Sequence, residues 1–249
     1  MTDERFTRSA MLWGAEAQER LGRAHVILFG LGGVGSYAAE CLARSGIGEL
    51  TLVDSDTISV SNINRQLEAL TSTVGLPKAE TVAARIRDIH PGVRVHPIHG
   101  LYSAKTREAF FPADCRYDYV VDAIDLVSCK LDLAETARRL GIPLIMALGT
   151  GNKLDPTALE ITDIASTRGC PLARVMRREL RRRGILHQKV VYSPEEARTP
   201  HFQPEDPPPG RRSVPASCPW VPAAAGLLLG SAVVRDLLRE SEKGEDAPC

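Results

Sequence analysis

Short apolar runs alternate with segments of helical spacing over about the first 150 residues of the chain. The run at 26–29 is apolar and β-branched, and it is short enough for a buried parallel strand. Further runs predict strands at 50–53, 93–98, 117–122 and 144–148. Helical spacing predicts helices from about Val34, at 78–90, at 105–110 and at 129–140. This alternation predicts an α/β fold with a doubly wound, mostly parallel sheet whose first half is Rossmann-like.

The pattern changes after Gly149. Strands are expected at 159–164 and 189–192, a basic helix at 171–183 and an apolar closing helix at 222–239. The stretch 197–217 holds six prolines among polar residues, a composition that favours a long loop over a packed core. We therefore expect one domain over 1–249, with a nucleotide-binding part at 1–150 and a smaller C-terminal substrate lobe at 151–249.

A glycine-rich turn follows the first strand. Gly30, Gly32 and Gly35 fit the pattern G-x-G-x-x-G, with Gly33 between them. Such glycines allow a tight turn and close approach of the backbone to phosphates, and the next helix points its free N–H groups at the anion. Asp54 ends the second strand about 20 residues later, where a carboxylate can bind a ribose hydroxyl. Alone, this pattern favours a generic dinucleotide-binding fold, such as that of an NAD enzyme.

A dense polar cluster follows the second strand, on the side where open α/β sheets bind ligands. Its members are Asp54, Asp56, Asn62, Asn64, Arg65, Gln66 and Lys78. Arginine supplies paired charge for phosphate oxygens, asparagine supplies directed donors, and aspartate can hold Mg²⁺. Asp122 and Asp125 end a later strand and are candidates for the metal, although Asp122 would equally serve only to cap that strand. The cluster favours a triphosphate over a nicotinamide cofactor.

Composition narrows the class of protein. The 249 residues carry zero net charge, so no global field draws the chain to nucleic acid or membrane. None of the six cysteines forms a C-x-x-C pair, so we expect no zinc site, no disulfides and a reducing, cytoplasmic location. Buried packing is expected for Cys41, Cys115 and Cys129. Packing is also favoured for Cys170 and Cys218, with a reactive role of Cys218 as the alternative. The six histidines show no metal-ligand spacing, and the apolar run 221–238 favours a buried helix over membrane insertion.

These motifs together resemble the E1-like (ThiF/MoeB/HesA) activating-enzyme superfamily, whose members adenylate a carboxylate with ATP. The resemblance rests on the glycine turn, Asp54-x-Asp56, Asn62-x-Asn-Arg-Gln66, Lys78 and Asp122-x-x-Asp125. The runs 149–157, 161–164, 171–174 and 190–195 are similar to one branch, the tRNA threonylcarbamoyladenosine dehydratases. That branch closes N6-threonylcarbamoyladenosine at position 37 of tRNA into its cyclic form. The alternatives are an adenylyltransferase for the C-terminal Gly-Gly of a sulfur-carrier protein, and a non-catalytic ATP- or NAD-binding module.

The resemblance implies roles for individual residues. ATP and Mg²⁺ are the expected cofactors, with Arg65, Lys78 and Asp125 catalytic and Asp125 holding the metal through ATP. The expected ATP-binding residues are Gly32, Gly33, Asp54, Asp56, Asn62, Asn64, Arg65, Gln66, Lys78, Asp122, Asp125 and Arg8. In a homodimer, Arg8 or Arg5 of the N-terminal arm (2–20) would reach the partner's nucleotide site, the alternative being a solvated arm. A cysteine desulfurase system is a further implied partner.

The basic helix bears on the substrate. Arg174, Arg178 and Arg181 fall at positions i, i+4 and i+7 of one helix face, with Arg182 beside them. Such a patch suits a phosphate backbone, so we expect these residues to bind tRNA. A solvated charged face, with Glu179 as a local partner, is the alternative.

Overall fold

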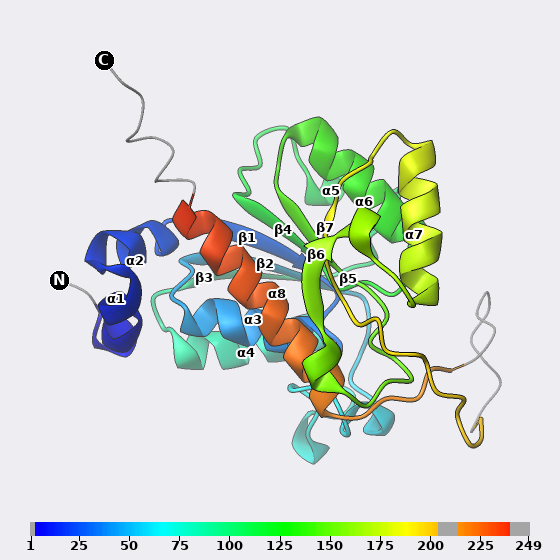
Figure 1. Cartoon of the computed structure of the whole chain (residues 1–249). Helices are drawn as coiled ribbons and strands as arrows, with labels where there is room; N and C mark the ends of the chain where they lie inside the picture. Colours follow the sequence, from blue (N-terminus) through cyan, green and yellow to red (C-terminus); the bar gives the residue numbers. More distant parts are fainter. Residues whose placement is uncertain (1–2, 204–213, 240–249) are drawn as a thin grey trace.

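The computed structural model describes residues 3–203 and 214–239 (Figure 1). The middle of the proline-rich loop, 204–213, lies outside this range. One seven-stranded sheet runs through the molecule in the order β3–β2–β1–β4–β5–β7–β6. Its strands are β1 (His25–Phe29), β2 (Glu49–Asp54), β3 (Arg94–His99), β4 (Tyr119–Asp122), β5 (Leu144–Ala147), β6 (Glu160–Asp163) and β7 (Lys189–Tyr192). All neighbours pair in parallel except β6 and β7.

Helices cover both faces of the sheet, as the doubly wound prediction requires (Figure 1). They are α1 (Thr7–Trp13), α2 (Ala15–Leu21), α3 (Gly35–Arg44), α4 (Lys78–Ile89), α5 (Arg107–Phe110), α6 (Val127–Leu140), α7 (Pro171–Arg182) and α8 (Trp220–Arg239). Short 3₁₀ turns occur at Glu4–Phe6, Val60–Asn62, Thr71–Thr73, Pro156–Ala158 and Ile164–Ser166. The predicted elements are confirmed to within a few residues, with the N-terminal segment broken at Gly14 (φ +87°).

Two apolar layers form the core because successive strand residues point to opposite faces. In β1, Val26 and Leu28 pack with α3, α4 and α8, whereas Ile27 and Phe29 pack with α5, α6 and α7. All four side chains are fully buried. The continuous apolar run that predicted a buried parallel strand thus serves both layers at once.

Helix α8 lies directly against α3. A Cβ on Gly226 would fall 2.3 Å from the Val34 carbonyl oxygen, and one on Gly230 would fall 2.6 Å from the Cβ of Cys41. The two glycines therefore permit this close helix contact. By length and composition α8 is the one helix in the described chain that could cross a membrane, but half of its apolar window is buried in the fold. The expected return of this helix to the fold is confirmed.

The C-terminal part of the chain completes the same sheet. β7 pairs in parallel with β5, and β6 pairs antiparallel with β7 at the edge. The segments that follow β5 and β7 therefore emerge near the carboxyl ends of β1 and β4, where the glycine turn and the polar cluster lie. This brings the two parts of the chain to one site.

Candidate active site

The glycine turn connects β1 to α3 and admits no side chain at two positions. Gly30 has φ +85°, and a Cβ there would fall 2.7 Å from the Ala123 carbonyl oxygen. A Cβ on Gly35 would fall 1.7 Å from the Gly30 carbonyl oxygen. Helix α3 begins here without a side-chain cap. The Ser36 N–H already donates to the Gly32 carbonyl (3.0 Å), and the helix dipole favours an anion at the remaining N–H groups of the first turn.

Asp54 and Asp56 organise the end of β2. The Asp54 carboxylate accepts hydrogen bonds from the Leu31 N–H (2.6 Å) and the Asp56 N–H (2.8 Å). It thus ties the glycine turn to the strand end and stays partly exposed, as a ribose ligand must. Asp56 Oδ2 lies 2.9 Å from the Nζ of Lys78 and is itself largely exposed.

Lys78 is only 5% exposed and stands at the first position of α4. A buried ammonium at the positive end of a helix dipole is unfavourable unless negative charge is close. Asp56 supplies part of that charge. A phosphate group bound between α3 and α4 would supply the rest, so the placement of Lys78 fits the predicted triphosphate.

The segment 61–66 carries the guanidinium and the amides. Arg65 Nη1 donates to the Ser61 carbonyl (2.9 Å) and to Asn64 Oδ1 (2.9 Å), which are neutral oxygens. Partial burial lowers the pKa of Arg65, with Glu68 acting in the opposite direction. Asn62 Oδ1 accepts from the Ser59 N–H (3.1 Å) and fixes the turn that precedes Arg65. The charge of Arg65 is thus held in place by uncharged partners.

Gln66 lies beneath the glycine turn. Its side chain is buried, and its Oε1 has no hydrogen-bond partner among the described residues. A Cβ on Gly32 would lie 3.4 Å from the Gln66 amide nitrogen, and one on Gly33 would lie 3.2 Å from the Arg65 carbonyl. The turn is thus a cradle without side chains, facing an unsatisfied amide. Both features suit a bound nucleotide.

Glu68 is a site residue that the sequence reasoning missed. It is 2% exposed, and neither carboxylate oxygen has a hydrogen-bond partner within the described part of the chain. Burial raises its pKa to about 7; Lys78 opposes this shift and Asp54 adds to it. No motif marks the residue, because only the fold buries it within reach of the charges of Lys78 and Asp54.

We expect Glu68 to make stability depend on pH. Its folded pKa (about 7) exceeds its ordinary value of 4.5, so the folded state holds a proton that the unfolded state releases. Stability should fall by up to about 3 kcal/mol as pH rises from 4.5 to 7, and then level off. The free energy of unfolding of Glu68→Gln, measured in urea, should lack this pH-dependent component. At pH 8 it should be larger than that of the wild type. Parallel pH profiles for the two proteins would contradict the assignment.

Asp122 and Asp125 occupy different environments. Asp122 is fully buried, 2.8 Å from the Nζ of Lys130, and its Oδ1 accepts from the Ile124 N–H (3.0 Å). Burial raises the pKa of Asp122, and Lys130 opposes that effect. Asp125 is exposed three residues later. The structure favours the strand-capping alternative for Asp122, and Asp125 is the more exposed of the two carboxylates.

The C-terminal part of the chain closes over this polar segment. Asn64 Nδ2 donates to the Ser217 carbonyl (3.1 Å), and Asn152 Oδ1 accepts from the Ala216 N–H (2.7 Å). Asn152 has a left-handed backbone (φ +61°), and its carbonyl accepts from the Arg198 N–H. Both ends of the proline-rich loop are therefore anchored beside the polar cluster. Sequence spacing gave no sign of these long-range contacts.

The N-terminal arm lies away from its own chain's site. Phe6 is buried, and its ring packs edge-on against His90 with the centroids 4.9 Å apart. His90 follows the last residue of α4, whereas Lys78 begins that helix about 18 Å away. Arg8 is exposed, and Arg5 pairs with Asp3. The arm is therefore not placed to complete the site of its own chain.

The basic helix α7 presents its arginines unequally. Arg178 and Arg182 each lie 3.0 Å from Glu179, in line with the solvated-face alternative. Arg174 and Arg181 are exposed, and their side chains have no ion-pair partner in residues 3–203 and 214–239. These two side chains are therefore the ones most available to a phosphate backbone.

The five cysteines within the described residues form no disulfide. Cys129 is buried as expected, while Cys41 and Cys115 are only partly buried. Cys170 and Cys218 are also buried: a Cβ on Gly149 would lie 2.6 Å from the Cys170 sulfur, and Cys218 Sγ lies 3.5 Å from the Lys153 carbonyl. Packing accounts for both positions.

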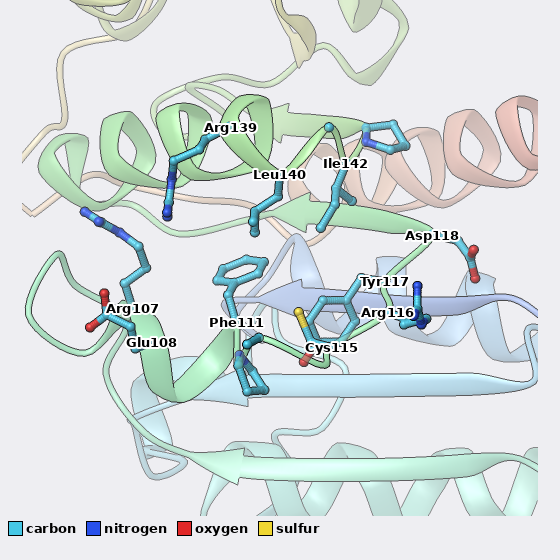
Figure 2. Close-up of a pocket in the computed structure, with 14 residues that line it drawn as sticks. Arg107, Glu108, Phe111, Cys115, Arg116, Tyr117, Asp118, Arg139, Leu140 and Ile142 are labelled. Carbon is cyan, nitrogen blue, oxygen red and sulfur yellow. The ribbon is translucent and has the colours of Figure 1, made fainter.

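A cavity of about 710 Å³ lies at the amino ends of β4 and β5, opposite to the carboxyl ends that hold the glycine turn (Figure 2). Its lining includes Arg107, Phe111, Arg116, Tyr117 and Arg139. Arg107 is paired there with Asp132. The cavity shares no residue with the glycine turn or the polar cluster. It is therefore separate from the candidate active site.

A doubly wound sheet, a glycine turn that leaves room for phosphate, and the cations Arg65 and Lys78 after the second strand are typical of a nucleotide-binding enzyme. The chain belongs to the ThiF family, whose model matches residues 6–240. The tRNA threonylcarbamoyladenosine dehydratase of Bacillus subtilis is 41% identical, with 95% of this chain and 96% of that protein covered. That of Escherichia coli is 43% identical over 72% of this chain and 66% of the relative. Structures of the Escherichia coli enzyme with ATP and with AMP have a TM-score of 0.86 at 35% identity, covering 96% of each chain.

Proposed function

We propose that the protein is an ATP-dependent tRNA threonylcarbamoyladenosine dehydratase. The observation that carries this proposal is the likeness over nearly the whole chain to a dehydratase solved with ATP and with AMP. The glycine turn between β1 and α3 of this chain supports it, because it leaves room for phosphate. The substrate is the threonyl carboxylate of N6-threonylcarbamoyladenosine in tRNA. The product is its cyclic form, and the net change is the loss of one water.

The reaction proceeds through an acyl-adenylate. A carboxylate resists nucleophilic attack because it is already negative, so one of its oxygens is first converted into a leaving group. That oxygen attacks the α-phosphorus of ATP, and pyrophosphate departs. The carbamoyl group of the same modification then attacks the activated carbonyl carbon, the ring closes, and AMP leaves with the former carboxylate oxygen.

The chain's own residues stabilise charge in both steps. Arg65 and Lys78 face the phosphates and offset the negative charge that develops on them, which is usually the largest contribution to such reactions. The N–H groups at the start of α3 bind a phosphate, and Asp54 holds the ribose. The exposed Asp125 would hold Mg²⁺ together with ATP, and the ion would supply further positive charge. No covalent protein nucleophile is needed.

Adenylation of a sulfur-carrier Gly-Gly terminus is the competing function. The chain lacks the C-x-x-C pairs that usually accompany it. The two functions separate in one assay with tRNA and carrier peptide as alternative acceptors. The proposed function requires mass analysis of tRNA nucleosides to show loss of one water from the modified adenosine, only with ATP and Mg²⁺. Pyrophosphate exchange driven by carrier peptide alone would overturn it.

For tRNA binding we expect Arg174 and Arg181 to act through phosphates. The double variant Arg174→Ala/Arg181→Ala should bind tRNA more weakly and lower the slope of log affinity against log salt by about 1.5, since each phosphate contact contributes roughly 0.7–0.9. Arg23→Ala, which removes an exposed arginine far from α7, is the matched control. Filter binding over a salt series measures both slopes. Equal slopes for the double variant and the control would refute this role.

We further propose a homodimer in which the arm of one protomer completes the site of the other. The exposure of Met11 and Leu12 on α1, above 80% for each, supports an arm that meets a partner. Arg8→Ala and Arg65→Ala should each be nearly inactive alone. Mixing and refolding the two variants should restore about a quarter of wild-type activity, because half of the dimers are mixed and each has one intact site. Failure of mixed dimers to recover activity would exclude the shared site.

We also propose a cysteine desulfurase system as partner and a cytoplasmic location. A cysteine desulfurase system as partner rests only on the family resemblance, and co-purification from a cell extract tests it. A cytoplasmic location follows from the tRNA substrate and from five free cysteines in the described chain. Fractionation of cells that express the protein checks the location.

A further inference from the structure

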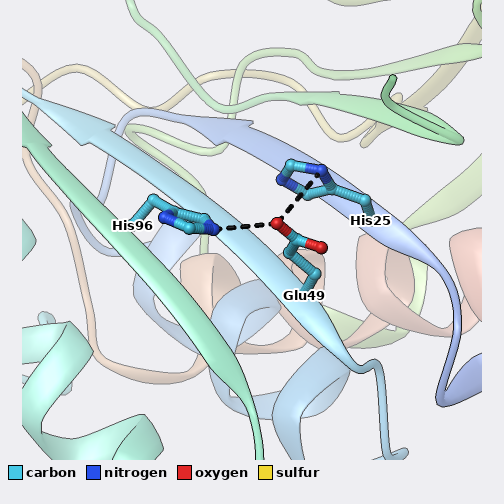
Figure 3. A group of neighbouring side chains, drawn as sticks. All are labelled: His25, Glu49 and His96. Atoms are coloured by element: carbon cyan, nitrogen blue, oxygen red, sulfur yellow. Dashed lines mark hydrogen bonds and ion pairs between the residues drawn. The ribbon is translucent and has the colours of Figure 1, made fainter. Parts of the chain in front are cut away.

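Three polar side chains meet where the first strands of the sheet begin (Figure 3). They are His25 on β1, Glu49 on β2 and His96 on β3. His25 is the register partner of Glu49, and His96 is the partner of Thr51, two residues further along β2. Because residues two apart point to the same side of a strand, all three side chains share one face. The cluster lies at the amino ends of these strands, whereas Asp54 and Asp125 lie at the carboxyl ends.

The distances suit coordination of one ion. Glu49 Oε1 lies 2.8 Å from His96 Nε2 and 3.7 Å from His25 Nδ1, and the three donor atoms all lie within 4.8 Å of one another. In a tetrahedral site with bonds of about 2.0–2.1 Å, neighbouring donor atoms stand roughly 3.3 Å apart. No two of the three donor atoms are more than 4.8 Å apart, so small side-chain rotations can bring them to this spacing.

Outer hydrogen bonds already orient the donors. His25 Nε2 lies 2.9 Å from the hydroxyl of the buried Thr51, so an Nε2–H donating to that hydroxyl leaves the Nδ1 lone pair facing Glu49. Arg94 Nε donates to Glu49 Oε2 (3.0 Å) and leaves Oε1 for the two imidazoles. Metal-binding histidines and carboxylates are commonly held in this way. Two lone-pair donors then face each other at 3.7 Å, an arrangement that a cation between them would stabilise.

The negative charges around the cluster favour a bound cation. Asp118, whose carboxylate accepts from the backbone N–H of His25 (2.7 Å), adds negative charge. Arg94 is the one cationic side chain hydrogen-bonded to Glu49 in the described chain, and it binds the oxygen that the metal does not need.

We propose that His25, Glu49 and His96 bind a divalent transition-metal ion that joins β1, β2 and β3. Two imidazoles and one carboxylate select Zn²⁺ over Mg²⁺ or Ca²⁺, which prefer oxygen ligands. The side chain of His96 is 51% exposed, so the ion has a route from solvent and a fourth position open to water. This site uses no cysteine, unlike the zinc site whose absence the sequence predicts. It stabilises the sheet and is independent of the proposed dehydratase chemistry.

The test uses the full chain, free of any polyhistidine tag and treated with chelator. Zn²⁺ is titrated in competition with a chromophoric chelator, and thermal unfolding is followed with and without the metal. One equivalent per chain should bind, and excess Zn²⁺ should raise the unfolding temperature by about 5 °C or more. His96→Ala, a change at a half-exposed position, should weaken binding at least about 100-fold. Thr51→Val, which loosens the hold on His25, should weaken it about 10-fold.

His99→Ala is the matched control, since it removes an exposed histidine of the same strand that lies outside the cluster. It should bind Zn²⁺ as the wild type does. Visible absorption of bound Co²⁺, characteristic of a tetrahedral site, should appear in the control and be lost in His96→Ala. Absence of stoichiometric binding, or an equal loss in the two histidine variants, would overturn the proposal.

Discussion

Replacing Arg65 with alanine is expected to slow AMP formation about 1,000-fold while the chain stays folded. Removal of one preorganised donor to a developing charge costs 10²–10³ in rate, and a charged arginine at a phosphoryl centre costs about 10³ or more. In the structure Arg65 hydrogen-bonds the neutral oxygens of Ser61 and Asn64, so its loss breaks no ion pair within the described residues. A coupled assay for AMP with modified tRNA measures the rate.

Two variants control this experiment. Arg65→Lys retains the charge and loses the planar pair of donors, so an intermediate rate is expected. Arg85→Ala removes an arginine of α4 that pairs with Glu40 of α3. The rate of this variant should equal that of the wild type. If Arg65→Ala stays within tenfold of the wild type, Arg65 does not act on the phosphates.

Replacing Lys130 with methionine is expected to destabilise the fold by about 3–5 kcal/mol. The Lys130–Asp122 pair is fully buried, and removal of one partner leaves an uncompensated charge in the core. The change should lower the unfolding temperature by roughly 10 °C for a chain of this size. Urea and thermal unfolding measure both quantities.

The double variant Lys130→Met/Asp122→Asn should recover most of the lost stability, because it removes both charges. Arg168→Ala breaks the exposed pair with Glu160 and should change stability by less than about 1 kcal/mol. A loss in Lys130→Met as small as in this control would show that Asp122 is not held by Lys130. Asp122 would then be free to contact the nucleotide, as the motif alone suggested.

The sequence was most informative where function and local structure share a contiguous motif. The glycine turn, Asp54 and the segment 62–66 lie within forty residues, and the fold places them together because parallel strands end at one edge. Hydrophobic periodicity likewise located the strands and helices. It could not specify that β6 runs antiparallel, because alternation of strands and helices carries no information on the direction of an edge strand.

The remaining features depend on contacts between distant segments. Glu68 becomes a proton-binding group only because the fold buries it without a hydrogen-bond partner. The anchoring of the proline-rich loop joins Asn64 to Ser217, more than 150 residues apart. His25, Glu49 and His96 show no ligand spacing in the sequence, and strand register alone brings them together. Local sequence patterns cannot identify such residues, because their roles depend on contacts with residues that are distant along the chain.

Transfer of an isotopic label tests most directly whether the polar cluster serves to form an acyl-adenylate. The substrate is tRNA whose threonyl carboxylate carries oxygen-18 at both oxygen positions, incubated with the protein, ATP and Mg²⁺. If the carboxylate attacks the α-phosphorus, each cyclised nucleoside should appear with one AMP that contains one labelled oxygen. Label in inorganic phosphate with release of ADP, or cyclisation with unlabelled AMP, would contradict this account.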